Sequence, residues 1–312
     1  MAEAHRLGMK VMFDLVYFHC GPRAVFLADH PDFIVRNPDG APKLGRWAFP
    51  EMNIANPAVR EYLYSNMLHL LDSYGADGFR CDVADILPVD FWEEGYRRCK
   101  RVRPDVFMMC EGLKGDDQIE AFDLSYGFYT QWALVEILKG KEPASALETA
   151  WLAERRDFPR GFHWMRCFEN HDFACLEPGQ RRKETLYGHE LNAALIATCF
   201  LLDGVPMVYN GQEIADAAPH SIFANRDHGK WCIDWTRAGD AAAVERRGLV
   251  RRLAAFRRAH PELFDAPLVW NRTSDPATSY SFTRRLSNGQ SVTLTVDLVR
   301  KSFEIAGMGR CD

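Results

Sequence analysis

The sequence predicts an α/β fold built around a parallel sheet, of the (β/α)-barrel type. Short apolar runs alternate along the chain with amphipathic helical stretches, which is typical of βαβ units. Acidic residues stand at or just past the ends of several apolar runs, where the loops of a parallel barrel gather. The alternation stops near residue 261, where hairpin patterns begin. The apolar runs begin at Lys10, Asp77, Val106, Ala121, His163 and Val205.

The helical stretches carry start signals as well as periodicity. The clearest is Pro57–Tyr74, because Asn56 suits the N-cap position and Pro57 suits the first helical position. The same period predicts further helices between the apolar runs. These span Asp90–Val102, Tyr129–Leu138, Ser145–Arg156, Glu184–Leu202 and Ala242–Arg258.

Two segments depart from this alternation. Residues 20–56 contain five prolines and three glycines, which predicts a long excursion after the first strand with a turn at Pro38-Asp39-Gly40. Residues 262–312 contain two alternating runs joined by Asn288-Gly289, a β-hairpin signature. We therefore expect a partial barrel domain over residues 1–261, including the excursion, and a partial all-β domain over residues 262–312.

Composition argues against several classes of partner. The 312 residues carry a formal net charge of −5 without a Lys/Arg cluster, so neither nucleic acid nor a membrane surface is an expected partner. No apolar run reaches the roughly 18 residues that suggest a membrane-spanning helix. The nine cysteines form no CxxC pair, which favours buried thiols over a disulfide framework or a zinc site. This usage slightly favours the cytoplasm but does not fix the localisation.

Four acidic residues are candidates for chemistry: Asp14, Asp82, Glu111 and Asp172. Each stands at the carboxyl end of an apolar strand or just beyond it, and their spacing corresponds to whole βα units. A doubly wound open sheet shows the same rhythm, but it would not bring carboxylates from nearly every strand to one centre. This pattern therefore favours the barrel.

Arg80 and Asp82 are two residues apart on one predicted strand, so their side chains share a face. Both should point into the barrel mouth, while Phe79, Cys81 and Val83 pack against helices. A guanidinium beside a carboxylate keeps that carboxylate ionised, as a nucleophile requires. A purely structural ion pair is the alternative and carries about equal weight.

Glu111 and Asp172 are individually ambiguous. Glu111 ends a strand with Phe107 and Met109 on its face, and apolar surroundings favour the protonated form that a general acid needs. Taken alone, Glu111 is better explained as a salt-bridged residue at a strand end. Asp172 follows Asn170-His171, whose side chains suit hydrogen bonding to sugar hydroxyls, yet an Asp taken alone is better explained as an N-cap. Together these residues supply the carboxyl pair that glycoside hydrolysis requires.

The combined motifs resemble the α-amylase family, glycoside hydrolase family 13. The resemblance covers essentially the whole chain. Its four motifs are matched by Asp14-Leu-Val-Tyr-Phe-His19, Gly78-Phe-Arg-Cys-Asp82, Glu111 and Phe168-Glu-Asn-His-Asp172, with Trp47–Asn53 and Gly204–Glu213 resembling two further segments.

The resemblance implies a role for each candidate residue. Asp82 would be the nucleophile, Glu111 the acid/base and Asp172 the stabiliser of the transition state. Arg80 would orient Asp82. The residues expected to contact sugar are Asp14, His19, Arg80, Asn170, His171 and, as a stacking platform, Trp47.

The chain also departs from the family pattern. Phe18 stands where the family usually has an Asn that helps hold calcium, and Asp85-Ile86 stand where Lys-His is common. We therefore expect no calcium at that site and no other cofactor. The chain begins in what resembles the helix before the third strand, so the expected fold is a (β/α)8 TIM barrel with strands 3 to 8 only. The strands Lys10–Leu15 and Met207–Asn210 would then have unpaired edges, through which the chain could self-associate.

The expected activity is that of a retaining glycoside hydrolase acting on α-glucosidic bonds of α-glucans or maltooligosaccharides through a glucosyl-enzyme intermediate. The alternatives are an amylase-like transglycosylase and an inactive, truncated chain with a binding or assembly role. A metal-dependent barrel enzyme would need clustered ligands such as HxH, which His19 and His171 do not form.

Overall fold

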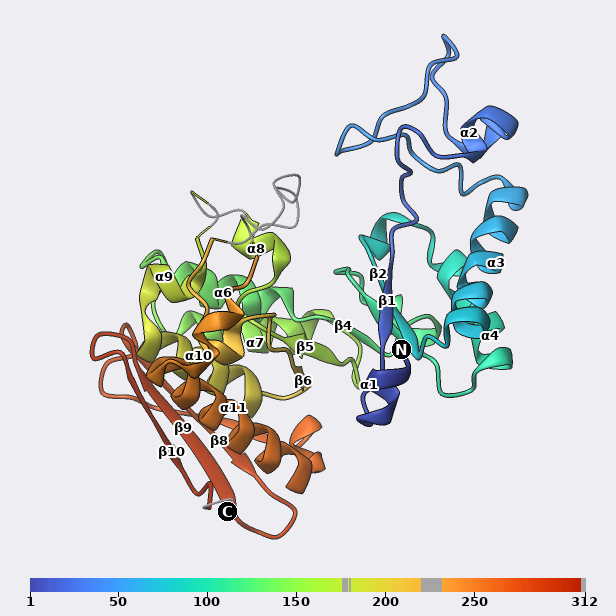
Figure 1. Cartoon of the computed structure of the whole chain (residues 1–312). Coiled ribbons are helices and arrows are strands. Elements are labelled where there is room, and N and C mark those ends of the chain that lie inside the picture. The colour runs from blue at the N-terminus through green and yellow to red at the C-terminus, as the bar shows by residue number, and fades with distance from the viewer. Residues whose placement is uncertain (176–178, 180, 220–231, 310–312) are drawn as a thin grey trace. The chain divides into compact units, whose positions relative to one another are not determined.

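The computed structural model describes residues 1–175, 179, 181–219 and 232–309 (Figure 1). Residue contacts divide the chain into two compact units. The first consists of Met1–Tyr126 with Phe158–His163, and the second of Gly127–Asp157 with Trp164–Asp312. Each unit contains part of the α/β framework.

The first unit is built on four parallel strands. They are β1 (Met12–Leu15), β2 (Gly78–Cys81), β3 (Phe107–Cys110) and β4 (Leu124–Tyr126), and each pairs with its successor along the chain. The sequence thus correctly predicted a parallel βαβ sheet. Gly78 allows β2 to approach β3 closely, because a Cβ at this residue would lie 2.2 Å from the Phe107 carbonyl oxygen.

Two long helices cover this sheet. Helix α3 (Pro57–Tyr74) begins as predicted, with the Asn56 side chain accepting from the Ala58 amide at 2.9 Å. It ends at Gly75, whose φ of +68° is a left-handed conformation that glycine adopts without strain. Helix α4 (Val89–Val102) packs beside it and contributes Phe91 and Trp92 to the core. The smaller elements of the unit are α1 (Ala2–Arg6), η2 (Ala84–Ile86) and α5 (Asp117–Glu120).

The strand faces are those expected from the sequence. Phe79 and Cys81 are fully buried in the core of this unit, whereas Arg80 lies on the other face of β2. Val83 ends the extended conformation of β2, because it adopts a φ of +39° and turns the chain into η2. A β-branched residue is uncommon in this region, and such strain occurs where surrounding contacts enforce it.

The excursion over residues 20–56 folds back on itself. It contains α2 (Phe26–Asp29) and η1 (Pro31–Phe33), followed by isolated antiparallel bridges such as Ile34 with Met52. The predicted turn is present, because Gly40 has a φ of +84° and the Asn37 amide donates to the Ala41 carbonyl. The returning chain carries Trp47 and Phe49 toward His19.

The second unit contains the strands β5 (Trp164–Arg166) and β6 (Val205–Pro206), which pair in parallel. Strand β6 lies before the predicted Met207–Asn210, where only the Met207 amide continues the ladder, by donating to Arg166. The unit's helices are α6 (Phe128–Leu138), α7 (Ala146–Asp157), α8 (His171–Cys175), α9 (Lys183–Tyr187), α10 (His189–Leu201) and α11 (Ala241–Ala259). The predicted helix Glu184–Leu202 is two helices, because Gly188, with a φ of +89°, breaks it.

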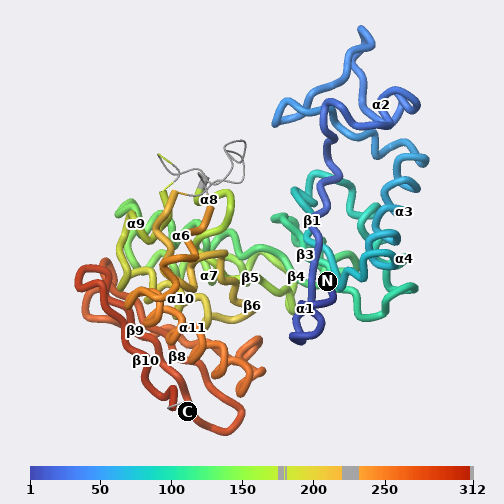
Figure 2. The backbone as a smooth tube through the Cα atoms, in the orientation of Figure 1, coloured from blue at the N-terminus to red at the C-terminus, as the bar shows by residue number. Residues whose placement is uncertain are grey.

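The C-terminal sheet has four antiparallel strands in the order β10-β9-β8-β7. They are β7 (Leu268–Asn271), β8 (Ser279–Arg285), β9 (Ser291–Asp297) and β10 (Ser302–Ala306). The hairpin at Asn288-Gly289 joins β8 to β9 as predicted. Figure 2 shows β8, β9 and β10 running beside α10 and α11, and the sheet shares one hydrophobic core with these helices. The strands of this sheet therefore begin at Leu268, after the short helix η6 (Pro261–Phe264), and the sheet shares its core with the helices.

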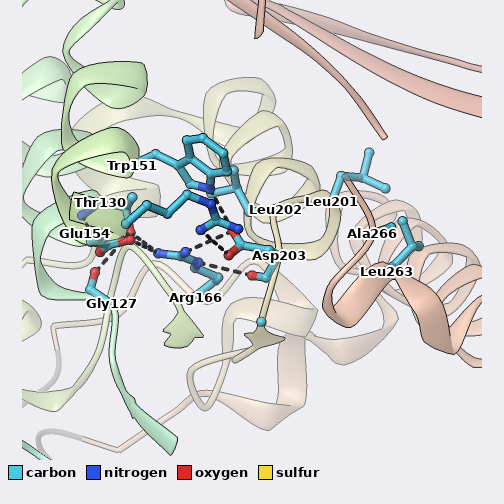
Figure 3. A network of polar contacts seen from close by, with 12 residues as sticks. Gly127, Thr130, Trp151, Glu154, Arg166, Leu201, Leu202, Asp203, Leu263 and Ala266 are labelled. Atoms are coloured by element: carbon cyan, nitrogen blue, oxygen red, sulfur yellow. Dashed lines mark hydrogen bonds and ion pairs between the residues drawn. The ribbon is translucent and has the colours of Figure 1, made fainter. Parts of the chain in front are cut away.

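Buried ion pairs support this second unit. Arg166, at the end of β5, donates to Glu154, Thr130 and Asp203, and Trp151 donates to Asp203 (Figure 3). All four polar side chains and Trp151 are less than a tenth exposed. The network therefore ties helices α6 and α7 to the strand ends.

Every described cysteine except Cys175, whose side chain is not described, is a free thiol, and Cys81, Cys110 and Cys199 are buried as expected. Burial raises the pKa of all three thiols, so they are poor nucleophiles. Within the described ranges, no helix combines the length and the apolarity needed to cross a bilayer.

Candidate active site

One guanidinium organises the acidic residues of the first unit. Arg80 Nη1 lies 2.8 Å from Asp14 Oδ1 and 2.5 Å from Asp82 Oδ1, and Arg80 Nη2 lies 2.5 Å from Glu111 Oε2. Since β1, β2 and β3 are adjacent and parallel, their ends deliver these side chains to one edge of the sheet. Four of the predicted site residues thus form one cluster.

The charges in this cluster explain its arrangement. Three carboxylates surround a single cation that is only 11% exposed, whereas the Asp14 side chain is 53% exposed. Burial by itself lowers the pKa of Arg80, but Tyr126, Glu111 and Asp14 outweigh it and raise that pKa above its ordinary value. Arg80 is therefore a permanent positive charge that offsets repulsion among the acids and holds Asp82 beside Glu111.

Glu111 has more polar surroundings than the sequence suggested. Its Oε2 accepts from Arg80 Nη2 and also from the Val83 amide at 3.0 Å. The left-handed turn at Val83 directs that amide toward Glu111. Both donors suit a carboxylate oxygen, so Glu111 is a salt-bridged strand-end residue, which was the alternative to apolar surroundings.

His19 and Trp47 meet in an aromatic cluster formed by the excursion. The His19 ring lies 5.5 Å from the Trp47 ring and 5.2 Å from the Phe49 ring, onto which it stacks. A pocket of about 400 Å³ opens beside His19 and Phe49. The Nδ1 atom of His19 is buried and has no hydrogen-bond partner among the described residues. A polar atom of this kind is suited to a ligand hydroxyl.

Phe18 occupies the position that departs from the family pattern. Its ring packs edge-on against Trp47 at 6.1 Å, so the position contributes packing and no oxygen ligand. Among the described residues, no three His, Cys, Asp or Glu side chains are grouped so that they could hold a metal. The calcium-free site stays a prediction, which elemental analysis of the purified chain would test.

The second unit positions the remaining three candidates at the start of α8. Asn170 is 2% exposed and its Oδ1 accepts from the Phe173 amide at 2.9 Å. Asn170 is therefore the N-cap, and the alternative that Asp172 caps the helix was wrong. His171 Nε2 lies 3.5 Å from Asp172 Oδ2, and both side chains are partly exposed. These two residues remain accessible to a ligand.

Sequence reasoning missed the polar residues that support this turn. Glu169 is 1% exposed and forms an ion pair with Arg182, which also contacts Asp216. The available signal was a glutamate directly after the buried run Trp164–Phe168, since a buried acid requires a partner. Nothing in the local pattern, however, identified the partner as Arg182.

Comparison with known proteins decides the family. Residues 43–277, more than half of the chain, match the family described as "Alpha amylase, catalytic domain". This chain belongs to the alpha-amylase family. The α-amylase-type fold is confirmed by solved structures, including a noncanonic maltogenic alpha-amylase from Thermotoga neapolitana. That structure has a TM-score of 0.82 and 25% identity, and the match covers 96% of this chain and 67% of that one.

Curated members of the alpha-amylase family are similar over most of this chain. Alpha-amylase MalA of Haloarcula japonica is 28% identical over 85% of this chain and 39% of its own length. The intracellular maltogenic amylase of Bacillus subtilis is 24% identical over 92% of this chain and 50% of its own. The chain thus spans about half the length, or less, of these relatives.

Proposed function

We propose that this chain has the catalytic residues of a retaining glycoside hydrolase that acts on α-glucosidic bonds of α-glucans or maltooligosaccharides. The observation that carries the proposal is the Arg80 guanidinium, which holds the carboxyl groups of Asp82 and Glu111 side by side at 2.5 Å from its two terminal nitrogens. A retaining mechanism requires two carboxyl groups about 5 Å apart. Relatives named as amylases and cyclomaltodextrinases support α-glucans as the substrate class.

The first half of the reaction forms a glucosyl ester. A carboxylate oxygen of Asp82 attacks the anomeric carbon while the bond to the leaving oxygen breaks, and Glu111 donates its proton to that oxygen. Arg80 favours this step because its guanidinium holds the Asp82 carboxyl group in place through a hydrogen bond. Since Oε2 of Glu111 already accepts from Arg80 and Val83, the proton is transferred from Oε1.

The second half releases the sugar. Glu111, now a carboxylate, takes a proton from water as that water attacks the anomeric carbon, and the ester bond to Asp82 breaks. We assign the accessible Asp172 to stabilise the oxocarbenium-like transition state, and His171, His19, Asn170 and Asp14 to sugar hydroxyls. Trp47, which is 41% exposed, is suited to stack on a sugar ring.

The anomeric configuration of the first product tests this mechanism. Proton NMR of maltotriose cleavage by the 312-residue chain should show the α-anomer before mutarotation, and the Asp82→Asn variant should show no product. The β-anomer as first product would contradict retention. Products longer than maltotriose would favour the transglycosylase alternative. Binding of maltotriose without turnover would favour the non-catalytic alternative.

A further inference from the structure

A buried ionic chain supports the turn that carries His171 and Asp172. Arg182, which is 1% exposed, donates from Nη2 to Glu169 Oε2 at 3.0 Å and from Nη1 to Asp216 Oδ2 at 3.3 Å. Glu169 immediately precedes Asn170, the N-cap of α8. One guanidinium therefore connects the motif after β5 to the segment after β6.

Several further hydrogen bonds hold the same cluster together. Arg182 Nη1 also donates to the Asn210 carbonyl at 3.2 Å, and Gln212 Nε2 donates to Glu169 Oε2 at 3.3 Å. The second carboxylate oxygen of Glu169 accepts from the Lys183 amide at 2.8 Å. Because both of its oxygens accept hydrogen bonds, the Glu169 carboxylate is held in one orientation. This restrains the backbone of the next residue, Asn170.

Gly211 shows how closely the segment after β6 approaches this guanidinium. Its φ is +91°, and a Cβ there would lie 3.0 Å from Arg182 Nη1 and 3.1 Å from the Asp216 Cβ. A side chain at this residue would be strained and would push against the ion pair. The backbone of residues 209–216 therefore packs closely against the Arg182 guanidinium.

The geometry points to Arg182 as a positioning residue for His171 and Asp172. We propose that it fixes the start of α8 by holding Glu169 against Asp216, so that the two accessible side chains are presented in one orientation. Supporting contacts of this kind preorganise the groups that touch a substrate. The inference rests on the proposed function, in which Asp172 acts in the transition state.

A consequence for kinetics follows from the role of Asp172. A loosened turn weakens an interaction made mainly in the transition state, so kcat should fall while KM changes little. A purely structural role would lower the melting temperature and leave the turnover of the folded enzyme unchanged. Comparing the loss of kcat with the loss of melting temperature therefore distinguishes a positioning role from a purely structural one.

Arg182→Lys is the variant to test, because Arg182→Ala would leave two buried carboxylates without a cation and prevent folding. Lysine keeps the charge but cannot contact both acids with a planar fork. Arg284→Lys is the matched control. Arg284 is fully buried on β8 and donates to the carbonyls of Leu201, Leu263 and Ala266, away from the α8 motif.

On maltotriose, Arg182→Lys should lower kcat about tenfold to hundredfold with KM within about threefold. Arg284→Lys should lower the melting temperature comparably and leave kcat within about twofold. Equal kcat losses in both variants, or an unchanged kcat in Arg182→Lys, would overturn the positioning role.

Hydrogen exchange provides a readout that needs no activity. The amides of Phe173 and Ala174, which donate to Asn170, should exchange faster in Arg182→Lys than in the wild type or in Arg284→Lys. Unchanged protection of these amides would contradict the inference. If the wild type cleaves no α-glucoside, the proposed function fails, whereas the exchange result still decides whether Arg182 holds the turn.

Discussion

Arg80 Nη1 lies 2.8 Å from Asp14 Oδ1, and the parallel pairing of β1 with β2 sets these two residues directly opposite each other. Asp14 is mostly exposed, so the contact by itself contributes little stability. Its importance lies in where it holds the guanidinium. With Asp14 on one side and Glu111 on the other, Arg80 has one orientation in which it also contacts Asp82.

The first prediction is that Arg80→Lys lowers kcat/KM on maltotriose by about a hundredfold. A lysine cannot contact Asp14, Asp82 and Glu111 from two nitrogens at once, and each lost charged hydrogen bond contributes roughly 1.5–3 kcal/mol. The control is Arg98→Lys, because Arg98 bridges Glu61 and Glu94 on the helices of the same unit. Steady-state kinetics that gave the same loss for both variants would contradict the orienting role.

Asp82→Asn should abolish turnover, because an amide is not a nucleophile. The variant should keep its fold, since asparagine has almost the same size and the Asp82 side chain is 22% exposed. Circular dichroism checks folding and product formation is measured by chromatography. Wild-type rates in a folded Asp82→Asn chain would remove Asp82 from the mechanism.

Glu111→Gln should lower kcat/KM for α-glucosyl fluoride far less than it lowers kcat/KM for p-nitrophenyl or alkyl glucosides. Fluoride leaves with little acid assistance, so the loss of the proton donor matters less for the glycosylation step. The measurement is the ratio of kcat/KM for the two donors in the variant and in the wild type. An equal reduction for both donors would indicate that Glu111 is not the general acid.

Asp203, a buried acid of the second unit, should make the stability of the fold depend on pH in the acidic range. Burial alone would raise the pKa of Asp203, but Arg166 and Arg155 lower it to about 2. In the unfolded chain an Asp has a pKa near 3.9, so Asp203 stabilises the fold above that pH. This stabilisation is lost as the pH falls from about 4 toward 2.

Asp203→Asn should therefore lower the free energy of unfolding at pH 7 by about 3 kcal/mol, because it leaves Arg166 with an uncompensated part of its charge. The difference from the wild type should shrink as the pH falls toward 2. Calorimetry over this pH range measures it, with Glu245→Gln, a 77% exposed acid on α11, as the control. A difference independent of pH would contradict the assignment.

The fifth prediction concerns the edge of β1. This strand pairs with β2 on one side, and on its other side no described residue forms a strand partner. Such an edge offers backbone donors and acceptors to another chain. Light scattering after size-exclusion chromatography should show self-association of the 312-residue chain, reduced in Met12→Lys. It should be unchanged in Val299→Lys, at an exposed residue of the turn between β9 and β10. A monodisperse wild-type monomer would contradict the prediction.

Local chemistry made several features predictable from the sequence. Asn56-Pro57 determines where α3 begins, and Asn288-Gly289 determines the hairpin between β8 and β9, because each depends on backbone preferences within a few residues. The acidic residues at strand ends could be recognised for a similar reason, since parallel strands all end at one edge of their sheet. The family resemblance added roles to these positions.

Contacts between residues far apart in the sequence determined other element boundaries and the partners of the buried acids. Gly188 ends α9 although the apolar pattern continues, and β6 lies before its predicted position because it pairs with Met165 and Arg166. Sequence reasoning missed the support of Glu169, because only the folded chain brings Arg182 to it and Asp216 to Arg182. The order of residues along the sequence shows which polar groups stand at each strand end. Which charge lies against which acid depends on long-range packing, because no local preference encodes it.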